Sequence, residues 1–561
     1  MGSREVWYVA KRIETPNHED LRTSVAALLT APERFNFVTD TFEQWRSDRL
    51  CILWLDDSGA ERRFSWRQLS DDASRVANVL RAHGVKKGDR VFIQIGRVPE
   101  WWQTMLGCLK IGAVAMPGTV MLTPKDIAYR MELSAPIAVV TESQYASRFD
   151  EVRDRSTSVE VYLSIGGGPR DGWVDFRSER DNAPAEATPE PMLATDPAIL
   201  FFTSGTTGFA KMVIHTQASY GIGHTVTAKY WIGLTPEDLH WNISDTGWAK
   251  AAWSSLFSPF IAGAAQLIHN PTGTFDAKRV LDILAQYPVT SMCGAPTIFR
   301  SIVLEDLNKW KFPHLKSCVA AGEPLNPEVI ATWKEHTSLE IRDGYGQTET
   351  CCLVANFRGL PIKPGSMGKP SPGYEIAIIG DDAKPLPAGR EGDIAIRTKP
   401  MRPVGLFKEY WHNPEGNAAC VRGDYYITGD RGTMDEDGYV WFVGRADDVI
   451  LSAGYRIGPF EVESALLEHP AVAESAVVSS PDEIRGEVVK AFVVLKPGHT
   501  GSDELVRDLQ EHTKTITAAY KYPRKIEFVT GLPKTVSGKI RRLELRNKEW
   551  GRGTAASSER E

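Results

Sequence analysis

An apolar segment followed by a loop of hydroxyl groups, glycines and a lysine places the strongest constraint on how this chain folds. Residues 197–202 predict a buried strand, and the loop that follows is Thr203-Ser204-Gly205-Thr206-Thr207-Gly208-Phe209-Ala210-Lys211. Glycine lets backbone N–H groups turn toward a ligand, while hydroxyls and lysine bind oxyanions. The loop therefore suits a polyphosphate. Its lysine comes three residues after the second glycine, so it is not the usual P-loop, and a polar surface turn is the alternative.

Strand and helix patterns alternate on both sides of this loop. We expect helices at 35–45, 65–84 and 101–111, strands at 91–95, 113–116 and 137–141, a buried helix and strand within 251–275, a helix at 280–287 and strands at 289–293 and 318–321. Such alternation predicts α/β units with mostly parallel sheets. Residues 166–191 are rich in Gly, Pro, Asp and Glu, and we expect an exposed linker there.

The second half of the chain changes in texture. Between 361 and 443, short apolar runs separated by Gly, Pro and Asp turns predict a small β-rich subdomain. After the polar break 444–448, the tail predicts helices at 459–468 and 503–512 and strands at 473–478, 488–495 and 525–529. The expected fold class is α/β, with two α/β subdomains plus the β-rich subdomain in an N-terminal domain (1–446), an α+β C-terminal domain (447–550) and a disordered tail (551–561).

Composition narrows the function classes. A chain of 561 residues with 42% hydrophobic and 24% charged residues is a multidomain globular protein. Its net charge of -7 argues against nucleic acid as a partner. The seven cysteines have neither C-x-x-C nor zinc spacing, and the first thirty residues carry acidic groups without a long apolar core. We therefore expect a cytoplasmic protein with reduced thiols and no membrane span.

Four further polar clusters suggest nucleotide chemistry. The first, Asp343-Gly344-Tyr345-Gly346-Gln347-Thr348-Glu349-Thr350, offers a ring for a planar base, a hydroxyl for phosphate and a carboxylate for Mg²⁺, although a helix N-terminus near Thr348 explains it equally well. The second is Asp430, expected at a strand end where it binds ribose hydroxyls. The third holds Arg445 and Asp447, and the fourth is a basic Gly-containing hairpin that carries Lys539. These three clusters also have purely structural explanations, namely a surface turn for Asp430 and for Arg445 with Asp447, and a solvated basic loop for Lys539.

Taken together and in this order, the clusters resemble the adenylate-forming (AMP-binding) superfamily from about Phe35 to Trp550. The segments Phe35-Asn36-Phe37, Arg97-Val98-Pro99-Glu100-Trp101-Trp102 and Tyr520-Lys521-Tyr522-Pro523-Arg524 look like the medium-chain acyl-CoA synthetases. Phe209-Ala210-Lys211-Met212 departs from the family, where Pro often precedes the lysine and Gly follows it. We expect the loop to tolerate this because Pro mainly restricts backbone freedom.

The resemblance implies an ATP-dependent ligase with Mg²⁺ and coenzyme A. A carboxylate attacks the α-phosphorus of ATP to give acyl-AMP and pyrophosphate, and the CoA thiol then takes the acyl group. The implied catalytic residues are Lys539, Thr348 and Glu349, with Glu349 also holding Mg²⁺. The implied nucleotide-binding residues are Thr203, Ser204, Gly205, Thr206, Thr207, Gly208, Lys211, Gly322, Glu323, Pro324, Asp343, Gly344, Tyr345, Asp430 and Arg445.

The resemblance also implies a C-terminal domain that rotates about Asp447 between the two half-reactions. Rotation removes Lys539 and brings in the CoA contacts, for which the candidates are Ala453, Gly454, Arg456, Arg485 and Lys521. The acyl pocket is expected at Trp248 and Gly346, and the absence of a bulky wall at Gly346 predicts acids longer than acetate. For Trp248, ordinary core packing is the alternative. The remaining functional alternatives are an enzyme that loads a carrier-protein thiol and a non-catalytic binder of nucleotide or acyl-CoA. The sequence does not define the oligomeric state.

Overall fold

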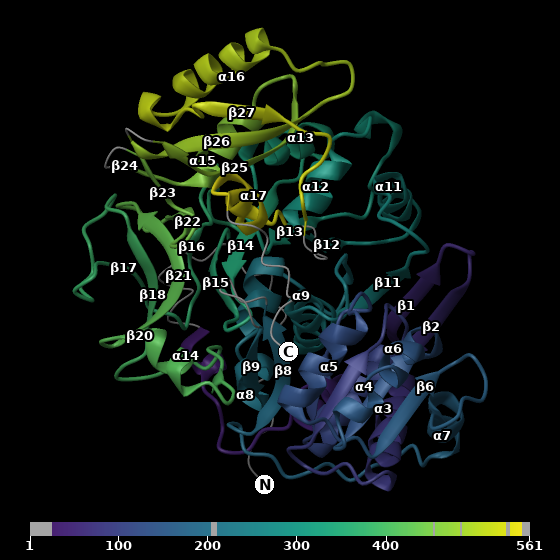
Figure 1. Cartoon of the computed structure of the whole chain (residues 1–561). Coiled ribbons are helices and arrows are strands. Elements are labelled where there is room, and N and C mark those ends of the chain that lie inside the picture. Colours follow the sequence, from purple (N-terminus) through teal and green to yellow (C-terminus); the bar gives the residue numbers. More distant parts are fainter. Residues whose placement is uncertain (1–24, 204–209, 453–454, 483–484, 535–538, 552–561) are drawn as a thin grey trace.

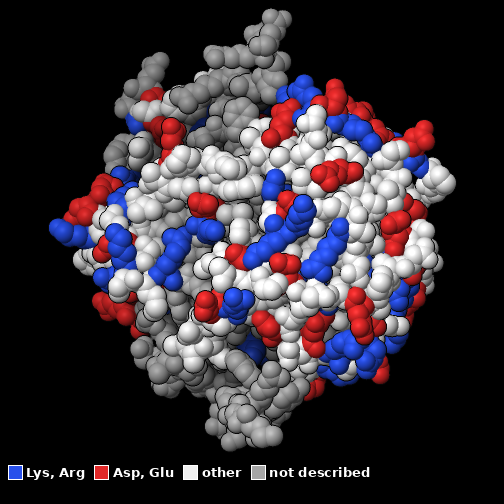
Figure 2. Space-filling view, turned by 90° about the horizontal axis from the view of Figure 1, so that it is seen from below, with Lys and Arg blue, Asp and Glu red and all other residues white. Residues whose placement is uncertain are grey.

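The computed structural model describes residues 25–203, 210–452, 455–482, 485–534 and 539–551. Within these ranges the strands form four sheets, and the C-terminal sheet lies above the ends of β13 and β14 in the view of Figure 1. None of the described helices is long and apolar enough to cross a membrane. On the face shown in Figure 2, Lys and Arg side chains lie interspersed with Asp and Glu. Neighbouring charges of opposite sign leave that face without long-range attraction for a polyanion.

The first large sheet has eight strands and is parallel from β8 to β7, with an antiparallel β9–β19 edge. In spatial order its strands are β19 (Glu409–Tyr410), β9 (Lys211–Thr216), β8 (Pro197–Thr203), β4 (Val114–Pro117), β3 (Arg90–Gln94), β5 (Ala138–Glu142), β6 (Val161–Ile165) and β7 (Val174–Asp175).

The second large sheet has nine strands and is parallel from β14 to β1. In spatial order its strands are β16 (Lys369–Pro370), β15 (Cys352–Ala355), β14 (Ile341–Gly346), β13 (Ser317–Ala321), β12 (Ser291–Gly294), β10 (Leu239–Asn242), β11 (Ala265–Asn270), β1 (Leu50–Asp56) and β2 (Glu61–Ser65).

Two smaller sheets complete the fold. The antiparallel third sheet contains β17 (Ile376–Ile379), β18 (Gly392–Arg397), β20 (Val421–Arg422), β21 (Tyr425–Met434) and β22 (Val440–Arg445), which agrees with the expected β-rich segment. The fourth contains β23 (Ile450–Ser452), β24 (Tyr455–Ile457), β25 (Val472–Asp482), β26 (Gly486–Leu495) and β27 (Lys525–Phe528).

Most of the expected helices form. Helix α3 (Trp66–Ala82) shows why: Ser65 and Gln68 make a capping box at its start, and Gly84 has a φ of 85° just past its end. The other α-helices are α2 (Phe37–Asp40), α4 (Glu100–Ile111), α5 (Pro124–Ser134), α6 (Ala146–Asp150), α7 (Phe176–Asn182), α8 (Gln217–Gly221), α9 (Ala249–Ala252), α10 (Ser258–Ala262), α11 (Ala277–Gln286), α12 (Pro296–Ile302), α13 (Pro327–Thr337), α14 (Pro414–Ala419), α15 (Pro459–Leu467), α16 (Asp503–Ile516) and α17 (Arg542–Glu549).

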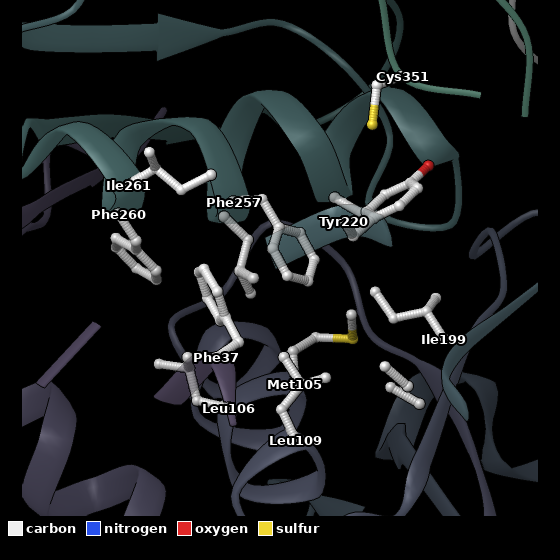
Figure 3. Close-up of a cluster of buried hydrophobic side chains, with 14 of the residues drawn as sticks. Phe37, Met105, Leu106, Leu109, Ile199, Tyr220, Phe257, Phe260, Ile261 and Cys351 are labelled. Carbon is white, nitrogen blue, oxygen red and sulfur yellow. The ribbon is translucent and has the colours of Figure 1, made fainter. Parts of the chain in front are cut away.

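One buried core connects the two large sheets. Figure 3 shows Met105, Leu106 and Leu109 of α4 facing Phe37, Phe257 and Phe260, with Ile199 of β8 at the edge of the same cluster. The rings of Phe37 and Phe257 lie 4.5 Å apart and both are almost fully buried. Because aromatic side chains bury large areas, such contacts stabilise the core cluster, which includes residues of both large sheets.

Two expectations about secondary structure are wrong. The helix predicted at 35–45 is divided into α2 and a 3₁₀ turn (Phe42–Trp45), because Thr41 between them has φ −127° and ψ −63°. The segment 166–191 is not an exposed linker, since it forms β7 and α7 and buries Phe176 completely. The Asp175 side chain caps α7, a local signal that the polar composition of the segment obscured.

Candidate active site

Strands β8 and β9 flank the hydroxyl-rich loop and bring the two ends of the loop together. Thr203 ends β8 and is the register partner of Lys211, which begins β9. The ammonium of Lys211 lies 4.7 Å from the centre of the Tyr410 ring, so its charge stays beside the loop. The intervening candidates Ser204, Gly205, Thr206, Thr207 and Gly208 lie outside the described residues.

Thr348 and Glu349 occupy a turn after β14, and not the start of a helix, so the alternative based on a helix N-terminus is wrong. Glu349 is partly buried; Tyr410 donates its hydroxyl proton to Glu349 Oε1 at 2.7 Å, and the N–H of Phe407 donates to the Glu349 carbonyl at 2.7 Å. Burial raises the pKa of Glu349, while Tyr410 and Lys211 oppose that shift.

A single carboxylate of this kind suits Mg²⁺ that also binds phosphate oxygens, because Mg²⁺ uses few protein ligands in nucleotide sites. Among the described residues, no group of three or more His, Cys, Asp and Glu side chains forms a separate metal cage. Glu349 is therefore the residue that fits a nucleotide-borne magnesium ion.

Three side chains contact the carboxylate of Asp430. Its Oδ2 accepts from the Tyr345 hydroxyl at 2.6 Å and from Gln347 Nε2 at 2.6 Å, and its Oδ1 lies 3.3 Å from Arg445 Nη1. Burial raises the pKa of Asp430, and Arg445 and these hydrogen bonds counteract it. The prediction that Asp430 sits at a strand end is wrong, because β21 continues to Met434 through a register shift beside it. The carboxylate faces Tyr345 of β14 from within the strand.

The segment 322–324, which directly follows β13, contributes Glu323 to the candidate site. Glu323 accepts from the Thr297 hydroxyl and pairs with Arg300 at 3.0 Å. Burial acts to raise the pKa of Glu323, but Arg300 and Thr297 outweigh it, so its pKa is lowered. Asp343, on β14, is buried, which raises its pKa to about 7, while Lys250 opposes the shift.

Two lysines meet at Gly322, beside Pro324 and Glu323. A Cβ placed on Gly322 would lie 3.3 Å from Lys250 Nζ and 3.9 Å from Lys539 Cε. Lys539 retains solvent contact, yet the protein atoms around its ammonium lower its pKa, opposed by Glu323 and Asp430. Burial lowers the pKa of Lys250 to about 8, with Lys539 acting in the same direction. Lys250 was not predicted as a site residue, because a lone lysine before the uncharged stretch that begins at 251 gives no local sign of its distant partners.

Two further tryptophans, Trp231 and Trp253, pack against each other near β14, the strand that carries the expected acyl-pocket residue Gly346. Trp248 is half-buried and directly precedes α9 as its N-cap, and its indole nitrogen has no hydrogen-bond partner in the described chain. The ring of Trp231 covers Gly344, where an added Cβ would come within 2.2 Å of it, and lies 5.7 Å from the Trp253 ring. Both extra tryptophans lie on π-helices, Thr227–Ile232 and Trp253–Phe257, a helix type often found at functional sites. At Gly346 a Cβ would meet the Cys351 carbonyl at 2.6 Å.

The candidates at the C-terminal end are only partly brought together. The Asp447 carbonyl accepts from Arg546, which also pairs with Asp448 at 3.1 Å. Lys521 pairs with Glu461, Arg456 is exposed, and the N–H of Arg485 donates to Asp482 at 2.8 Å. Tyr455 and Tyr520 stack with ring centres 4.4 Å apart on the surface nearby. Ala453 and Gly454 lie outside the described residues.

Comparisons with known proteins identify the family to which the chain belongs. The AMP-binding enzyme family matches residues 39–411, and the AMP-binding enzyme C-terminal domain matches residues 461–539. The chain belongs to the AMP-binding enzyme family. The human mitochondrial acyl-coenzyme A synthetase ACSM3 is 47% identical over 98% of this chain and 96% of its own length.

Two solved structures share the fold. The anthranilate CoA ligase AuaEII, solved with anthranoyl-AMP, is 31% identical with a TM-score of 0.86 and covers 92% of this chain and 98% of its own. A benzoate CoA ligase from Burkholderia xenovorans LB400 is 27% identical with a TM-score of 0.80 over 91% and 100%. This member of the AMP-binding family is an acid–thiol ligase, an acyl-CoA synthetase that uses ATP, Mg²⁺ and CoA and forms acyl-AMP before the thioester.

Proposed function

We propose that this AMP-binding enzyme activates a medium-chain, branched or aromatic carboxylic acid. The support is the aromatic side chains near the proposed acyl pocket: Trp231 covers Gly344 and packs against Trp253, and Trp248 lies directly before α9. Such side chains favour apolar acyl groups and planar rings, because ring faces and edges pack closely. The names of the similar enzymes, which include an anthranilate and a benzoate CoA ligase, agree with an acid larger than acetate.

In the adenylation step the carboxylate oxygen bonds to the α-phosphorus and the bond to pyrophosphate breaks. Both reactants are anionic, so their approach needs cations. Lys539 and Lys250, which converge at Gly322, would neutralise the carboxylate and the α-phosphate. Thr348 would contact the α-phosphate, and Thr203 and Lys211 would hold the leaving pyrophosphate. Mg²⁺, when bound at Glu349, would shield the phosphate charges.

The nucleotide and CoA would contact separate parts of the molecule. Asp430 and Arg445 would bind ribose, while Gly322, Pro324 and Tyr345 would frame adenine. Asp447 would serve as the hinge between domains 1–446 and 447–550, after which Arg456, Arg485 and Lys521 would meet the CoA phosphates. The exposed Tyr455–Tyr520 stack would lie beside that path.

The observation that supports this assignment most is the convergence of Lys539, from the C-terminal part, with Lys250 and Gly322 of the large sheet. Its test is ATP–pyrophosphate exchange and CoA thioester formation with a panel of acids from acetate to decanoate, plus 2-methylbutyrate, benzoate and anthranilate. We expect exchange and thioester formation with the larger acids and little with acetate. Exchange without thioester formation would favour a carrier-protein thiol as the acceptor, and exchange with no acid would leave only a binding function.

The cytoplasm remains our proposed location. All seven cysteines are free thiols, six of them buried, which suits a reducing compartment. The similar human enzyme carries a mitochondrial name, and fluorescence of a tagged full chain in its own cells distinguishes the two sites.

A further inference from the structure

A buried histidine outside the expected site touches the turn that carries Thr348 and Glu349. His215 lies on β9, four residues after Lys211, and is fully buried. Its Nε2 lies 2.7 Å from the Thr348 carbonyl oxygen and its Nδ1 lies 3.0 Å from Ser219 Oγ. No sequence motif predicted a role for His215, because it lies in β9, a strand whose sequence otherwise indicates only core packing.

The two hydrogen bonds define which nitrogen carries the proton. Burial lowers the pKa of His215 to about 3, so the ring is neutral at physiological pH and has a single N–H. A carbonyl oxygen only accepts, so Nε2 carries the hydrogen and donates it to Thr348. Nδ1 then accepts from the Ser219 hydroxyl, whose oxygen also accepts from the Thr216 N–H at 2.8 Å. The ring is held in one orientation, with Tyr220 packed 4.2 Å from its centre.

This contact crosses from one large sheet to the other. Thr348 and Glu349 follow β14 of the nine-stranded sheet, while His215 belongs to the edge of the eight-stranded sheet. Tyr410, which pairs with Val213 of β9, holds the Glu349 side chain from the same edge. Lys211 lies over Tyr410 at the start of that strand. Strand β9 therefore carries both Lys211, proposed to hold the pyrophosphate, and His215, which contacts the backbone of the turn with Thr348 at the proposed α-phosphate site.

We propose that His215 is a positioning residue for adenylation, a role that rests on the functions assigned above to Thr348 and Glu349. It sets the distance between the segment that holds the leaving pyrophosphate and the turn that holds the α-phosphate and Mg²⁺. An in-line displacement depends on that alignment, and a small displacement of either segment lowers the rate steeply. Thioester formation from acyl-AMP involves no pyrophosphate, so it depends on this alignment much less.

The test separates the half-reactions in the full-length protein. His215→Phe removes the donor and leaves the Thr348 carbonyl without its partner, whereas His215→Gln keeps an N–H near the position of Nε2. With hexanoate and MgATP, we expect His215→Phe to lower kcat/KM for pyrophosphate exchange about 10- to 100-fold. Thioester formation from supplied hexanoyl-AMP and CoA should change about threefold or less, and His215→Gln should restore most of the exchange.

His240→Phe is the matched control. His240 is equally buried and both of its ring nitrogens are hydrogen-bonded, but to Ser291 of β12 and to Ser254 on the π-helix 253–257. It should lower the melting temperature and affect both half-reactions alike. Equal losses of both half-reactions in His215→Phe, no loss of exchange, or a failure of Gln to restore it in a folded protein would overturn the proposal. Glu349→Gln tests the underlying assignment separately: if it leaves exchange intact, the role of the turn is wrong, whatever His215 does.

Discussion

The hydroxyl of Tyr345 donates to Asp430 Oδ2 at 2.6 Å, joining the nine-stranded sheet to the β-rich sheet at the proposed ribose site. Arg445 faces the other oxygen of the same carboxylate from the neighbouring strand β22. The carboxylate is therefore oriented before a nucleotide arrives, and pre-orientation lowers the entropic cost of binding.

The first prediction concerns this carboxylate. Asp430→Asn removes the charge that faces Arg445 and one strong acceptor for ribose hydroxyls, so the KM for ATP should rise about 10- to 100-fold in pyrophosphate exchange. Tyr345→Phe keeps the carboxylate and should have a smaller effect. Asp437→Asn, on an exposed turn that pairs with Lys363, is the control and should change the KM less than about twofold. An unchanged KM in Asp430→Asn contradicts the ribose assignment.

The second prediction concerns Lys539. Lys539→Ala should abolish pyrophosphate exchange while thioester formation from supplied acyl-AMP continues, because only the first half-reaction brings two anions together. Lys534→Ala is matched to it: the residue lies five positions earlier on the same segment and pairs with Glu474 at 2.7 Å. That control should retain both activities. If Lys539→Ala loses both half-reactions equally, the lysine does not act in adenylation alone.

The sequence predicted the local elements well, and the reasons are visible at particular residues. Ser65 at the start and Gly84 past the end marked α3, and short apolar runs between Gly, Pro and Asp turns marked β17 and β18. It predicted poorly where tertiary contacts override composition, as at Phe176, which pulls a polar segment into a helix on the core. In the candidate site, too, residues in local clusters were predicted, whereas residues that depend on distant contacts were not.

Residues in Gly-rich clusters could be proposed from the sequence, because residue types suited to turns and phosphate binding stand close together in the chain. Lys250 and His215 could not, since each becomes significant only through partners distant in sequence: Ala321, 71 residues from Lys250, and Thr348, 133 residues from His215. A lone lysine or histidine in an apolar segment gives no local signal of such a contact.

The third prediction is a pH dependence of stability from Lys250. Its pKa falls from 10.5 to about 8 on folding, so between these values the unfolded chain binds more protons than the folded one and the free energy of unfolding rises with pH. At pH 7 the buried charge costs about 3 kcal/mol. Lys250→Met should therefore raise the melting temperature of the unliganded protein below pH 8, with the gain diminishing toward pH 10.5.

Paired thermal melts of Lys250→Met and the parent protein between pH 7 and 10.5 measure this difference directly. The neighbouring Asp343, whose pKa is about 7, still titrates at the lower end of this window, so the change in the difference between pH 8.5 and 10.5 is the part assigned to Lys250. Lys278→Met, at an exposed position 3.9 Å from Glu305, controls for the loss of one surface charge. A gain that stays constant with pH would show that Lys250 titrates as an ordinary lysine.

The fourth prediction concerns acyl selectivity at Gly346. A tryptophan at this position would narrow the pocket, so Gly346→Trp should shift the preference in kcat/KM from hexanoate toward acetate or propionate. The backbone allows this only with movement, because any Cβ here meets the Cys351 carbonyl at 2.6 Å. Gly346→Ala measures that backbone effect on its own and should lower activity with all acids about equally. If Gly346→Trp and Gly346→Ala keep the same chain-length profile as the parent protein, Gly346 does not line the acyl pocket.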